Sequence, residues 1–583
     1  MKYQLKTKTN YNLIDNEMTL YNLLKDRGIK EPSAWLYPSE QHELSPITLN
    51  NMDKAIDILG TTLKNKEANI LIVVDSDTDG MTSGAIIYNL LNRICYTQEI
   101  GYVLHPGKEH GIEINDIPED VDLIIVPDAS SSEKDKHLFL LEQGKKIIVL
   151  DHHIIEDNDL DYGKYNDNIA IVNSQLEYAN PALSGAGVAL KFVQAYSSKY
   201  KVTFPMKTYA LAACGIIADV MDMSFLENKY IVSMGLKYLP EHTFLYTLIC
   251  NGHYNMEKPI PTIRDLGWII GPNLNAVIRL GTMEQKHIVF RALCNPDALC
   301  ISTKRGEEGE EVYIFEEAVR ICENAKKRQT ASVTRNLKII EEDLVEDGHN
   351  SIIYVDEDQS LTFELSGLIA NKLLTKYGKP TILLKPFYNE KNELEYRGSV
   401  RSKSVENLND FKSFVADITG VNFAMGHSNA FGISIEKDNL VEFKAHLNSL
   451  LDKIDFHNSF YEVDLISSPS ALNIEAAKTF GRDDIWAQGI DKPLAALEEI
   501  STINHEFMGK EQQHLKISCG KFDVIIFNCP DLTEQIKNGS KFNISAIGEF
   551  SIDTSYNIGR LQYIVNDYEL TPIQEYNVMD MIF

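Results

Sequence analysis

The chain has 583 residues, of which 44% are hydrophobic and 24% charged, a composition typical of a globular protein with domains of roughly 150 residues. Its 84 acidic and 56 basic residues leave a net charge of −28, which argues against nonspecific nucleic-acid binding and leaves room only for a local basic groove. There is no apolar run of membrane-spanning length, no apolar core of a secretory signal in MKYQLKTKTNYNL and no C-x-x-C pair among the eight cysteines. We therefore expect a cytoplasmic protein that makes no membrane contact and holds no structural zinc.

The first two-thirds of the chain predict a helical lead-in (1–65), then an α/β domain (66–310) and a connecting helix (311–348). In the α/β domain, helical stretches separate strand-like apolar runs: ILIVV (70–74), LIIVP (123–127), KIIVL (146–150) and IAIVN (169–173). Such alternation favours a doubly wound parallel sheet. The 311–347 stretch contains neither Pro nor Gly and would reach roughly 55 Å as one helix.

The last part of the chain predicts a smaller α/β domain (349–458) and then a β-rich domain with a tail (459–583). Strand-like runs of the smaller domain are SIIYV, TILLKPF and EYRGSVRS. From about residue 490 the runs become short and closely spaced, as in HLKIS, FDVIIFN, FNISAIGEF and GRLQYIVNDYEL. This spacing is typical of a small barrel such as an OB-fold.

Three aspartates, Asp75, Asp77 and Asp79, follow the first strand in the stretch DSDTDG. The pattern D-x-D-x-D-G opens a calcium loop, but that loop requires Glu at its twelfth position and a helix before it. Here the twelfth residue is Ile86 and a strand comes first. The P-loop pattern is absent too. A polar turn and a metal site remain open at this point.

Other strand ends add similar side chains. Asp128 follows the second strand, Asp151-His152-His153 the third, and Asp219 another apolar stretch, LAACGIIAD. Because parallel strands bring their C-terminal ends to one edge, these groups should meet there, and their charges would repel without divalent cations. Carboxylates with imidazole suit Mn²⁺ or Mg²⁺, and two such ions form the usual clamp for phosphodiester hydrolysis.

In this order the motifs resemble those of the DHH phosphoesterase superfamily, and more closely those of the RecJ-type single-strand exonucleases. Further stretches of the chain are similar to RecJ motifs: HPGKEHGIE (105–113), LSGAGVALKF (183–192), GPNLNAVIRLG (271–281), CENAKKRQ (322–329), YRGSVRS (396–402) and MGHSNAFG (425–432). The resemblance covers roughly residues 66 to 575. The chain departs from it where PDAS replaces the usual D-C-G, and where Ile278 and Met425 replace glycine.

The resemblance implies a role for each matching residue of the cluster. Asp77 would bind one metal ion, and Asp79, His152 and Asp219 the other. Asp128 would bridge the two ions, because one carboxylate must serve both.

Three catalytic residues are implied as well. Asp75 would be a nearby ligand or would support the ligands, Asp151 would orient its neighbours, and His153 would face the scissile phosphate. The alternative for His153 is a structural hydrogen bond to its own loop. No covalent intermediate is expected.

A second set would bind substrate, since a guanidinium fork matches phosphate oxygens and a glycine turn lets the backbone approach closely. Its members are Asn275, Arg279, Ser399, Arg401, Gly426 and His427. If they capture a terminal 5′-phosphate, the enzyme works from 5′ to 3′. The alternative for Arg401 is a surface salt bridge.

The resulting expectation is a metal-dependent 5′–3′ exonuclease for single-stranded DNA, in recombination, repair or replication. A nano-RNase or cyclic-dinucleotide phosphodiesterase is one alternative, although such enzymes generally lack a β domain like the last one here. A non-catalytic replication scaffold is another, and the net charge of −28 favours it. The tail QEYNVMDMIF is either a frayed terminus or a binding segment for a clamp or single-strand-binding protein.

Overall fold

The computed structural model describes residues 2–13, 16–107, 110–155, 160–253, 258–307, 309–344, 348–389, 391–403, 405, 408–454, 456, 460–553 and 559–573. These residues form two compact units, one mainly from Asn324–Tyr461 and the other from Tyr3–Glu323 with Glu462–Phe583. Along the described ranges, no helix combines the length and the apolar character needed to cross a membrane. The tail QEYNVMDMIF lies outside the described residues.

The larger unit contains the predicted parallel sheet. Its strands pair in the order β3-β2-β4-β5-β6, all parallel. Their bounds are β2 (Asn69–Val74), β3 (Glu99–Leu104), β4 (Leu123–Pro127), β5 (Lys146–Asp151) and β6 (Ile169–Asn173). β3 was not predicted from the sequence, because this strand lies at the sheet edge, is mostly half-buried and lacks a continuous apolar run.

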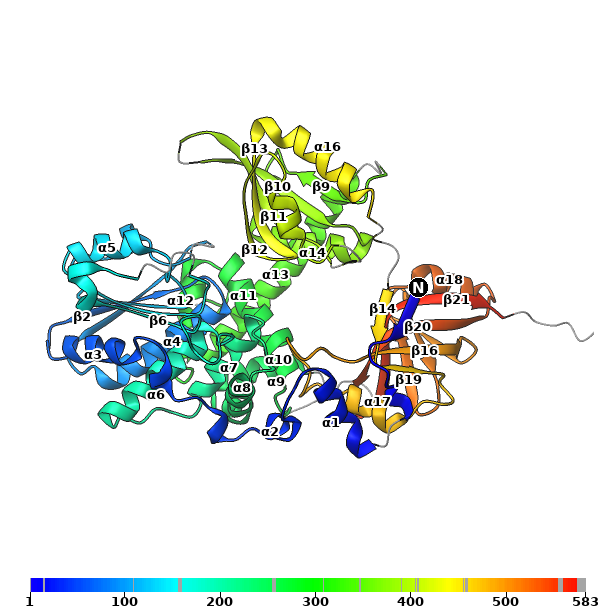
Figure 1. Cartoon of the computed structure of the whole chain (residues 1–583), viewed down its shortest axis with the longest axis horizontal. Helices are drawn as coiled ribbons and strands as arrows, with labels where there is room; N and C mark the ends of the chain where they lie inside the picture. Colours follow the sequence, from blue (N-terminus) through cyan, green and yellow to red (C-terminus); the bar gives the residue numbers. More distant parts are fainter. Residues whose placement is uncertain are drawn as a thin grey trace, which may run out of the picture. The chain divides into compact units, whose positions relative to one another are not determined.

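Helices cover both faces of this sheet, as expected for a doubly wound fold. Three lie on one face, α3 (Met52–Thr62), α4 (Thr78–Ile94) and α6 (Gly185–Tyr200), and α5 (Lys134–Glu142) lies on the other (Figure 1). Leu71 and Val73 of β2 pack with Leu140 and Leu141 of α5. Strand order reverses beside β2, which pairs with both β3 and β4. In open α/β sheets, ligands bind outside the strand C-termini at such a reversal.

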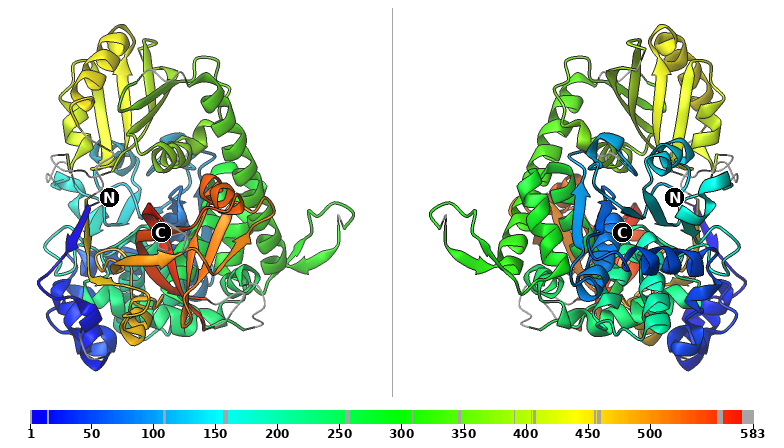
Figure 2. Two further views of the ribbon diagram at one scale, coloured as in Figure 1. Left: turned by 90° about the vertical axis from the view of Figure 1, so that its right-hand side faces the viewer. Right: turned by 90° about the vertical axis from the view of Figure 1, so that its left-hand side faces the viewer.

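A helical segment follows the sheet in the same unit. It consists of α7 (Thr208–Ala218), α8 (Leu226–Tyr238), α9 (Thr243–Gly252), α10 (Ile263–Asp265), the π-helix η7 (Leu266–Ile270), α11 (Gly271–Leu280) and α12 (Met283–Cys294). The hairpin of β7 (Leu299–Ile301) and β8 (Glu311–Tyr313) then projects outward (Figure 2). Because residues 311–313 pair in this hairpin, the long helix α13 (Ile314–Asp343) begins three residues later than predicted.

The smaller unit is a five-stranded sheet in the order β12-β13-β11-β10-β9, in which only β9 and β10 are parallel. Its strands are β9 (Ile352–Val355), β10 (Thr381–Tyr388), β11 (Leu394–Arg401), β12 (Val421–His427) and β13 (Ala430–Glu436). Its helices are α14 (Ser366–Tyr377), α15 (Phe411–Ala416) and α16 (Leu440–Leu451), with α14 and α16 on opposite faces of the sheet (Figure 1). Its core forms between the sheet and the pair α15 and α16.

The C-terminal part of the larger unit is a seven-stranded mixed sheet in the order β15-β16-β20-β21-β19-β18-β17. Its strands are β15 (Leu465–Ser467), β16 (Leu494–Ser501), β17 (His505–Met508), β18 (His514–Ser518), β19 (Phe522–Ile526), β20 (Phe542–Ile552) and β21 (Leu561–Pro572). The remaining elements here are β14 (Phe460–Val463), α17 (Ile474–Phe480) and α18 (Pro530–Lys537).

The N-terminal segment packs against this C-terminal sheet, a placement that no local pattern predicts. The segment contains β1 (Lys2–Leu5), α1 (Asn16–Asp26) and α2 (Pro32–Leu36). Leu23, Leu24 and Trp35 are buried in the same core as the strands of the C-terminal sheet. Arg27 donates two hydrogen bonds to the buried carboxylate of Asp464, at 2.8 and 3.0 Å.

Candidate metal centre at the parallel sheet edge

The DSDTDG stretch forms the turn between β2 and α4. Asp77 is the N-cap of α4 and accepts a hydrogen bond from the backbone N–H of Gly80 (2.9 Å). Asp75 accepts a bond from the backbone N–H of Gly111 (3.1 Å) and lies 2.7 Å from His110 Nδ1. All three carboxylates therefore stand at the strand C-terminus, as the sequence analysis predicted.

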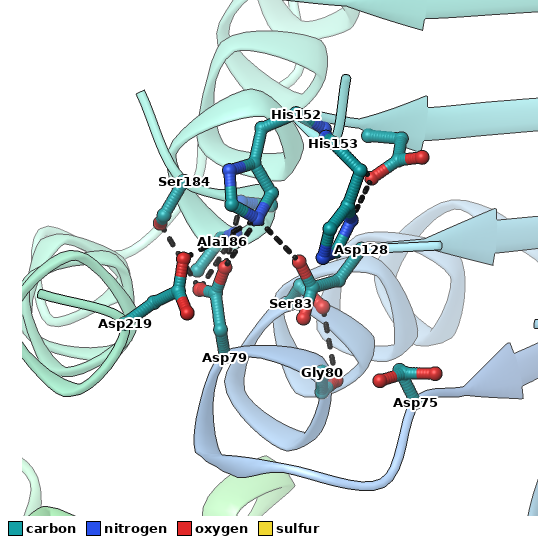
Figure 3. A network of polar contacts seen from close by, with 12 residues as sticks. Asp75, Asp79, Gly80, Ser83, Asp128, His152, His153, Ser184, Ala186 and Asp219 are labelled. Carbon is teal, nitrogen blue, oxygen red and sulfur yellow. Dashed lines mark hydrogen bonds and ion pairs between the residues drawn. The ribbon is translucent and has the colours of Figure 1, made fainter. Parts of the chain in front are cut away.

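Asp79 is held by the N-terminus of another helix, α6. Its carboxylate accepts bonds from the backbone N–H groups of Gly185 (2.7 Å) and Ala186 (3.0 Å) and from the hydroxyl of Ser184 (3.0 Å) (Figure 3). The partial positive charge of a helix N-terminus stabilises such an anion. Asp79 is thus a fixed, buried carboxylate 105 residues away in sequence from the serine that binds it.

Asp128, His152 and Asp219 complete the cluster. Asp128 follows β4, His152 follows β5, and Asp219 is the C-cap of α7, so the apolar run before Asp219 is a helix. His152 Nε2 lies 3.2 Å from Asp128 Oδ1, 3.4 Å from Asp219 Oδ2 and 3.9 Å from Asp79 Oδ2 (Figure 3). One imidazole nitrogen is therefore surrounded by three carboxylates.

The side chains form overlapping sets whose potential ligand atoms lie within 4.8 Å of one another. One set contains Asp79, His152 and Asp219, a second contains Asp75, Asp77 and Asp128, and a third joins Asp128 to residues 151–153. Asp128 belongs to two sets and directly neighbours His152, so its carboxylate lies at the junction of the cluster.

Like charges at close range shift the titration of these groups. Burial, and then the charges of Asp79 and Asp77, raise the pKa of Asp128 well above its ordinary value and that of Asp219 to about 8. Burial and the charges of Asp79 and Asp75 raise the pKa of Asp77 to about 6. Burial lowers the pKa of His152, which favours the neutral imidazole that binds metals.

The atoms at the centre of the cluster fit a divalent cation. Among the described residues, Asp128 Oδ1 and His152 Nε2 are buried and have no hydrogen-bond partner, although such atoms are normally satisfied. A Cβ atom at Gly185 would collide with the Asp128 carboxylate, and one at Gly215 with that of Asp79. Carboxylate-rich donors with one imidazole suit Mn²⁺ or Mg²⁺.

Asp151 and His153 form a pair beside the cluster. Buried Asp151 accepts bonds from the backbone N–H groups of His152 (2.7 Å) and Ser131 (3.1 Å), and its Oδ1 lies 2.8 Å from His153 Nδ1. This last hydrogen bond is the main cause that raises the pKa of His153 to about 9. The His153 side chain is 59% exposed, so it is an accessible imidazolium fixed at one edge by a buried carboxylate.

The backbone around the cluster adopts conformations that non-glycine residues rarely take. The φ angle is +70° at Asp128, +81° at Ser130 and +58° at Val220, which follows Asp219. Positive φ is costly for L-residues and most of all for β-branched ones, and strained residues concentrate at functional sites. The strain here adjoins two of the predicted metal ligands.

The predicted substrate-binding residues fall in different places. Asn275 and Arg279 lie on α11 in the larger unit: the side chain of Asn275 accepts a bond from Thr78 Oγ1 (3.1 Å), and the exposed Arg279 interacts electrostatically with Asp77. The remaining residues lie on strands of the smaller unit, Ser399 and Arg401 on β11 and Gly426 on β12. The side chain of His427 lies outside the described part of the chain.

Several residues that support the cluster were not predicted from the sequence. Ser184 and His110 lie in stretches quoted only for their resemblance to family motifs, where neither residue was given a role. A third group links Ser130 to Glu133 (2.6 Å) and to the buried His137 (3.0 Å). Glu133 in turn accepts a bond from the Ile112 N–H (2.9 Å), so the loop after β4 contacts the loop that holds Asp75. The contacts of Ser184 with Asp79, of His110 with Asp75 and of Glu133 with Ile112 join residues too far apart in sequence to leave a local signal.

Comparison with known proteins places this geometry in a family. Residues 69–216 match the N-terminal domain of the DHH family, and residues 463–567 match the RecJ OB domain. YorK, a protein of the SPbeta prophage of Bacillus subtilis named as a single-strand DNA-specific exonuclease, is 34% identical over 539 residues, which cover 90% of each chain. The chain belongs to the RecJ family of DHH proteins.

Other RecJ proteins extend the likeness over nearly the whole chain. RecJ of Bacillus subtilis is 25% identical over 583 residues, covering 96% of this chain and 68% of that protein. The crystal structure of RecJ from Thermus thermophilus in complex with Mn²⁺ matches with a TM-score of 0.70 at 19% identity, covering 97% of this chain and 79% of that one. This RecJ-family chain therefore has the RecJ fold, including a C-terminal OB domain.

Proposed function

We propose that the chain is a metal-dependent exonuclease that hydrolyses single-stranded DNA from its 5′ end, with two divalent cations, Mn²⁺ or Mg²⁺. The observation that carries this proposal is the buried cluster in which Asp128 joins the set with Asp75 and Asp77 and neighbours His152 of the other set. Its relatives are named as single-strand DNA-specific exonucleases, and one solved relative is in complex with Mn²⁺. The full set of ligands opposes the scaffold alternative.

The ligand assignment follows the geometry of the sets. Asp77 and Asp75 would hold one cation, and Asp79, His152 and Asp219 the other, with Asp128 shared between them. When bound, the two ions supply an activated water and stabilise the leaving oxygen of the phosphodiester. Ser184 and the α6 N-terminus keep Asp79 in one orientation, so this ligand loses little conformational entropy on metal binding.

The remaining residues would act on the substrate. His153 is accessible, and its pKa of about 9 keeps it protonated at neutral pH, so it can donate to a phosphate oxygen. Buried Asp151 holds the other edge of that ring. Asn275 and Arg279 border the Asp77 side of the cluster. Ser399, Arg401, Gly426 and His427 would bind the terminal 5′-phosphate, which sets the direction of degradation.

One experiment tests the activity, polarity and metal site together. The protein and its Asp128→Ala variant are incubated with Mn²⁺ and a single-stranded DNA that carries a 5′-phosphate and a 3′ label. We expect a ladder of progressively shorter labelled products from the unsubstituted protein only. Immediate release of a labelled mononucleotide would instead show 3′–5′ polarity. Cleavage of dinucleotides but not of this DNA would support the nano-RNase alternative.

A further inference from the structure

The antiparallel strands of the smaller unit carry an ordered set of polar and aromatic side chains on one face. Residues directly opposite each other on antiparallel strands lie on the same face, in rows two residues apart. Arg401 of β11 pairs with Ala430 of β13, and Ser399 two residues earlier pairs with Gly432, which faces Met425 of β12. The next row along β11 contains Arg397, which pairs with Ser434.

The Arg397 row extends across four strands. Arg397 is opposite Lys385 of β10, and Ser434 is opposite Phe423 of β12. One row further, Phe387 of β10 is opposite Glu395. The rows with Arg401 and Ser399 belong to the predicted terminal-phosphate site, so the rows of Arg397 and Phe387 continue from that site along the same face.

The residues between these positions along each strand point to the opposite face of the sheet, which packs against the core. Tyr396 and Val400 of β11, and Phe431 and Ile433 of β13, are buried against α15 and α16. By contrast, the proposed face leaves these side chains half-buried or exposed: Lys385, Phe387, Arg397, Phe423 and Met425. Met425 is 59% exposed. The start of α14 covers the other end of β11, where Ser366 Oγ lies 2.9 Å from Ser399 Oγ. The turn before α14 reaches the edge of the proposed face, because the Lys385 ammonium lies 4.5 Å from the centroid of the Phe363 ring.

The flat guanidinium of Arg397 lies close to two aromatic rings. Its guanidinium carbon lies 3.8 Å from the centroid of the Phe387 ring and 5.6 Å from that of Phe423. Glu395 holds its edge through an Nε donor at 2.6 Å, and the Arg397 side chain remains 39% exposed. Glu395 itself is buried and also accepts bonds from Ser434 and Asn422, so the arginine cannot swing freely.

Building on the proposed function, we propose that Arg397, Phe423 and Phe387 form a stacking surface for a nucleobase of the single-stranded substrate, next to its terminal phosphate. Aromatic rings and guanidinium planes stack on bases of any sequence, and a nearby lysine attracts the backbone. Lys385 supplies that charge one strand away. In a chain of net charge −28, Lys385 and Arg397 place cationic groups beside the rings of Phe387 and Phe423 on this part of the sheet face. These are the groups that single-strand binding uses.

The test measures binding without cleavage. Fluorescence anisotropy in EDTA compares the affinity for a 5′-phosphorylated DNA strand of about 12 nucleotides with the affinity for strands that have an abasic nucleotide at the second, third or fourth position. We expect one of these positions to weaken binding by the unsubstituted full-length protein about tenfold, the order of one lost base stack. An abasic nucleotide near the 3′ end serves as the reference.

The Phe423→Ala variant should bind the intact DNA about tenfold more weakly and should no longer respond to the sensitive abasic position. Tyr388→Ala is the matched control, because Tyr388 is 63% exposed on the same strand as Phe387 but has the opposite parity. It should behave like the unsubstituted protein. Arg397→Lys keeps the charge beside Glu395 and loses the flat surface, so it repeats the test if Phe423→Ala fails to fold.

The outcomes separate this surface from the proposed function. If the unsubstituted protein cuts and binds single-stranded DNA but Phe423→Ala and Arg397→Lys respond to abasic positions as it does, the stacking surface is wrong and the exonuclease remains. If the unsubstituted protein neither binds nor cuts such DNA, both proposals fail. If Tyr388→Ala lost as much DNA affinity as Phe423→Ala, the stacking surface would also be wrong, because Tyr388 lies on the opposite face of the sheet.

Discussion

The two α/β sheets of this protein position functional side chains in opposite ways. In the parallel sheet, the side chains come after the strands, they are mostly buried, and carboxylates dominate. In the smaller sheet, they come from one face of the strands, they are partly exposed, and Arg397 is paired with Glu395. Strand ends converge on a point and suit an ion, whereas rows along a sheet face suit an extended chain.

This contrast has an energetic consequence. Without a cation, the aspartates of the strand-end cluster lower the stability of the folded chain, because burial and like charges disfavour their ionisation. The sheet face is internally compensated by its ion pair and needs no ligand to be stable. Substitutions at the strand ends should therefore abolish most of the cleavage activity. Substitutions on the sheet face should weaken the affinity for DNA by smaller amounts.

The largest effect should come from Asp128→Ala. Loss of the shared carboxylate should lower the cleavage rate by about 10³-fold or more, since metal ions contribute several kcal/mol to the transition state. The same change removes a buried carboxyl whose Oδ1 has no hydrogen-bond partner and whose ionisation the neighbouring aspartates disfavour, so the melting temperature in EDTA should stay equal or rise. Thermal denaturation with and without Mn²⁺ checks this. A variant that keeps both its activity and its Mn²⁺ stabilisation would refute the central place of Asp128.

Arg401→Lys should have an intermediate effect. Lysine keeps the positive charge but loses the two parallel donors that match a phosphate. We expect the preference for 5′-phosphorylated over 5′-hydroxyl DNA to fall about tenfold, while kcat on saturating DNA stays close to its original value. Kinetics on the two substrates measure this. A loss of kcat with an unchanged preference would place Arg401 in the chemistry instead of at the 5′ end.

The metal-free cluster should make stability depend on pH. The pKa of Asp219 is raised to about 8 in the folded chain, so the folded state keeps a proton that the unfolded chain releases near pH 4, roughly the ordinary carboxyl value. The contribution of this proton to stability is full below about pH 4 and is lost as the pH rises towards 8.

Asp219→Asn removes that titration, so the melting temperatures of this variant and of the unsubstituted protein measure its contribution to stability. In EDTA, the gain in melting temperature from this substitution should be a few degrees larger at pH 8.5 than at pH 5.5. With Mn²⁺ present, the sign should reverse, because the variant lacks a ligand. A gain that does not change with pH would show that Asp219 is ionised in the metal-free protein at both values.

The smallest expected effect concerns Ser130, whose φ of +81° favours glycine. Ser130→Gly relieves the strain but loses the bonds to Glu133 and His137, whereas Ser130→Ala loses the same bonds and keeps the strain. The alanine variant should therefore be less stable than the glycine variant by about 1 kcal/mol. Urea denaturation of both variants checks the order. Equal stabilities would mean that the loop relaxes away from this conformation.

Much of the catalytic edge could be predicted from the sequence. Four strands of the parallel sheet appear as continuous apolar runs, because strands buried on both faces have no polar alternation. Carboxylates and histidines placed directly after such runs must gather at one edge, since parallel strands share a direction. The strand β3 was not predicted, because an edge strand is only half-buried and does not form a continuous apolar run. Asp219 was correctly placed in the cluster, although its position depends on the end of a helix.

Only the tertiary structure determined what holds and surrounds that edge. Ser184, Gly185 and Ala186 bind Asp79 across more than 100 residues of sequence, and Ser130 joins two loops through Glu133. The packing of Trp35 into the C-terminal core is equally remote in sequence. Local periodicity reports whether a residue faces a core, and a motif reports which ligands follow a strand. Neither reports which distant backbone groups, rows of strands or turns complete the site, because those contacts depend on how the elements pack together.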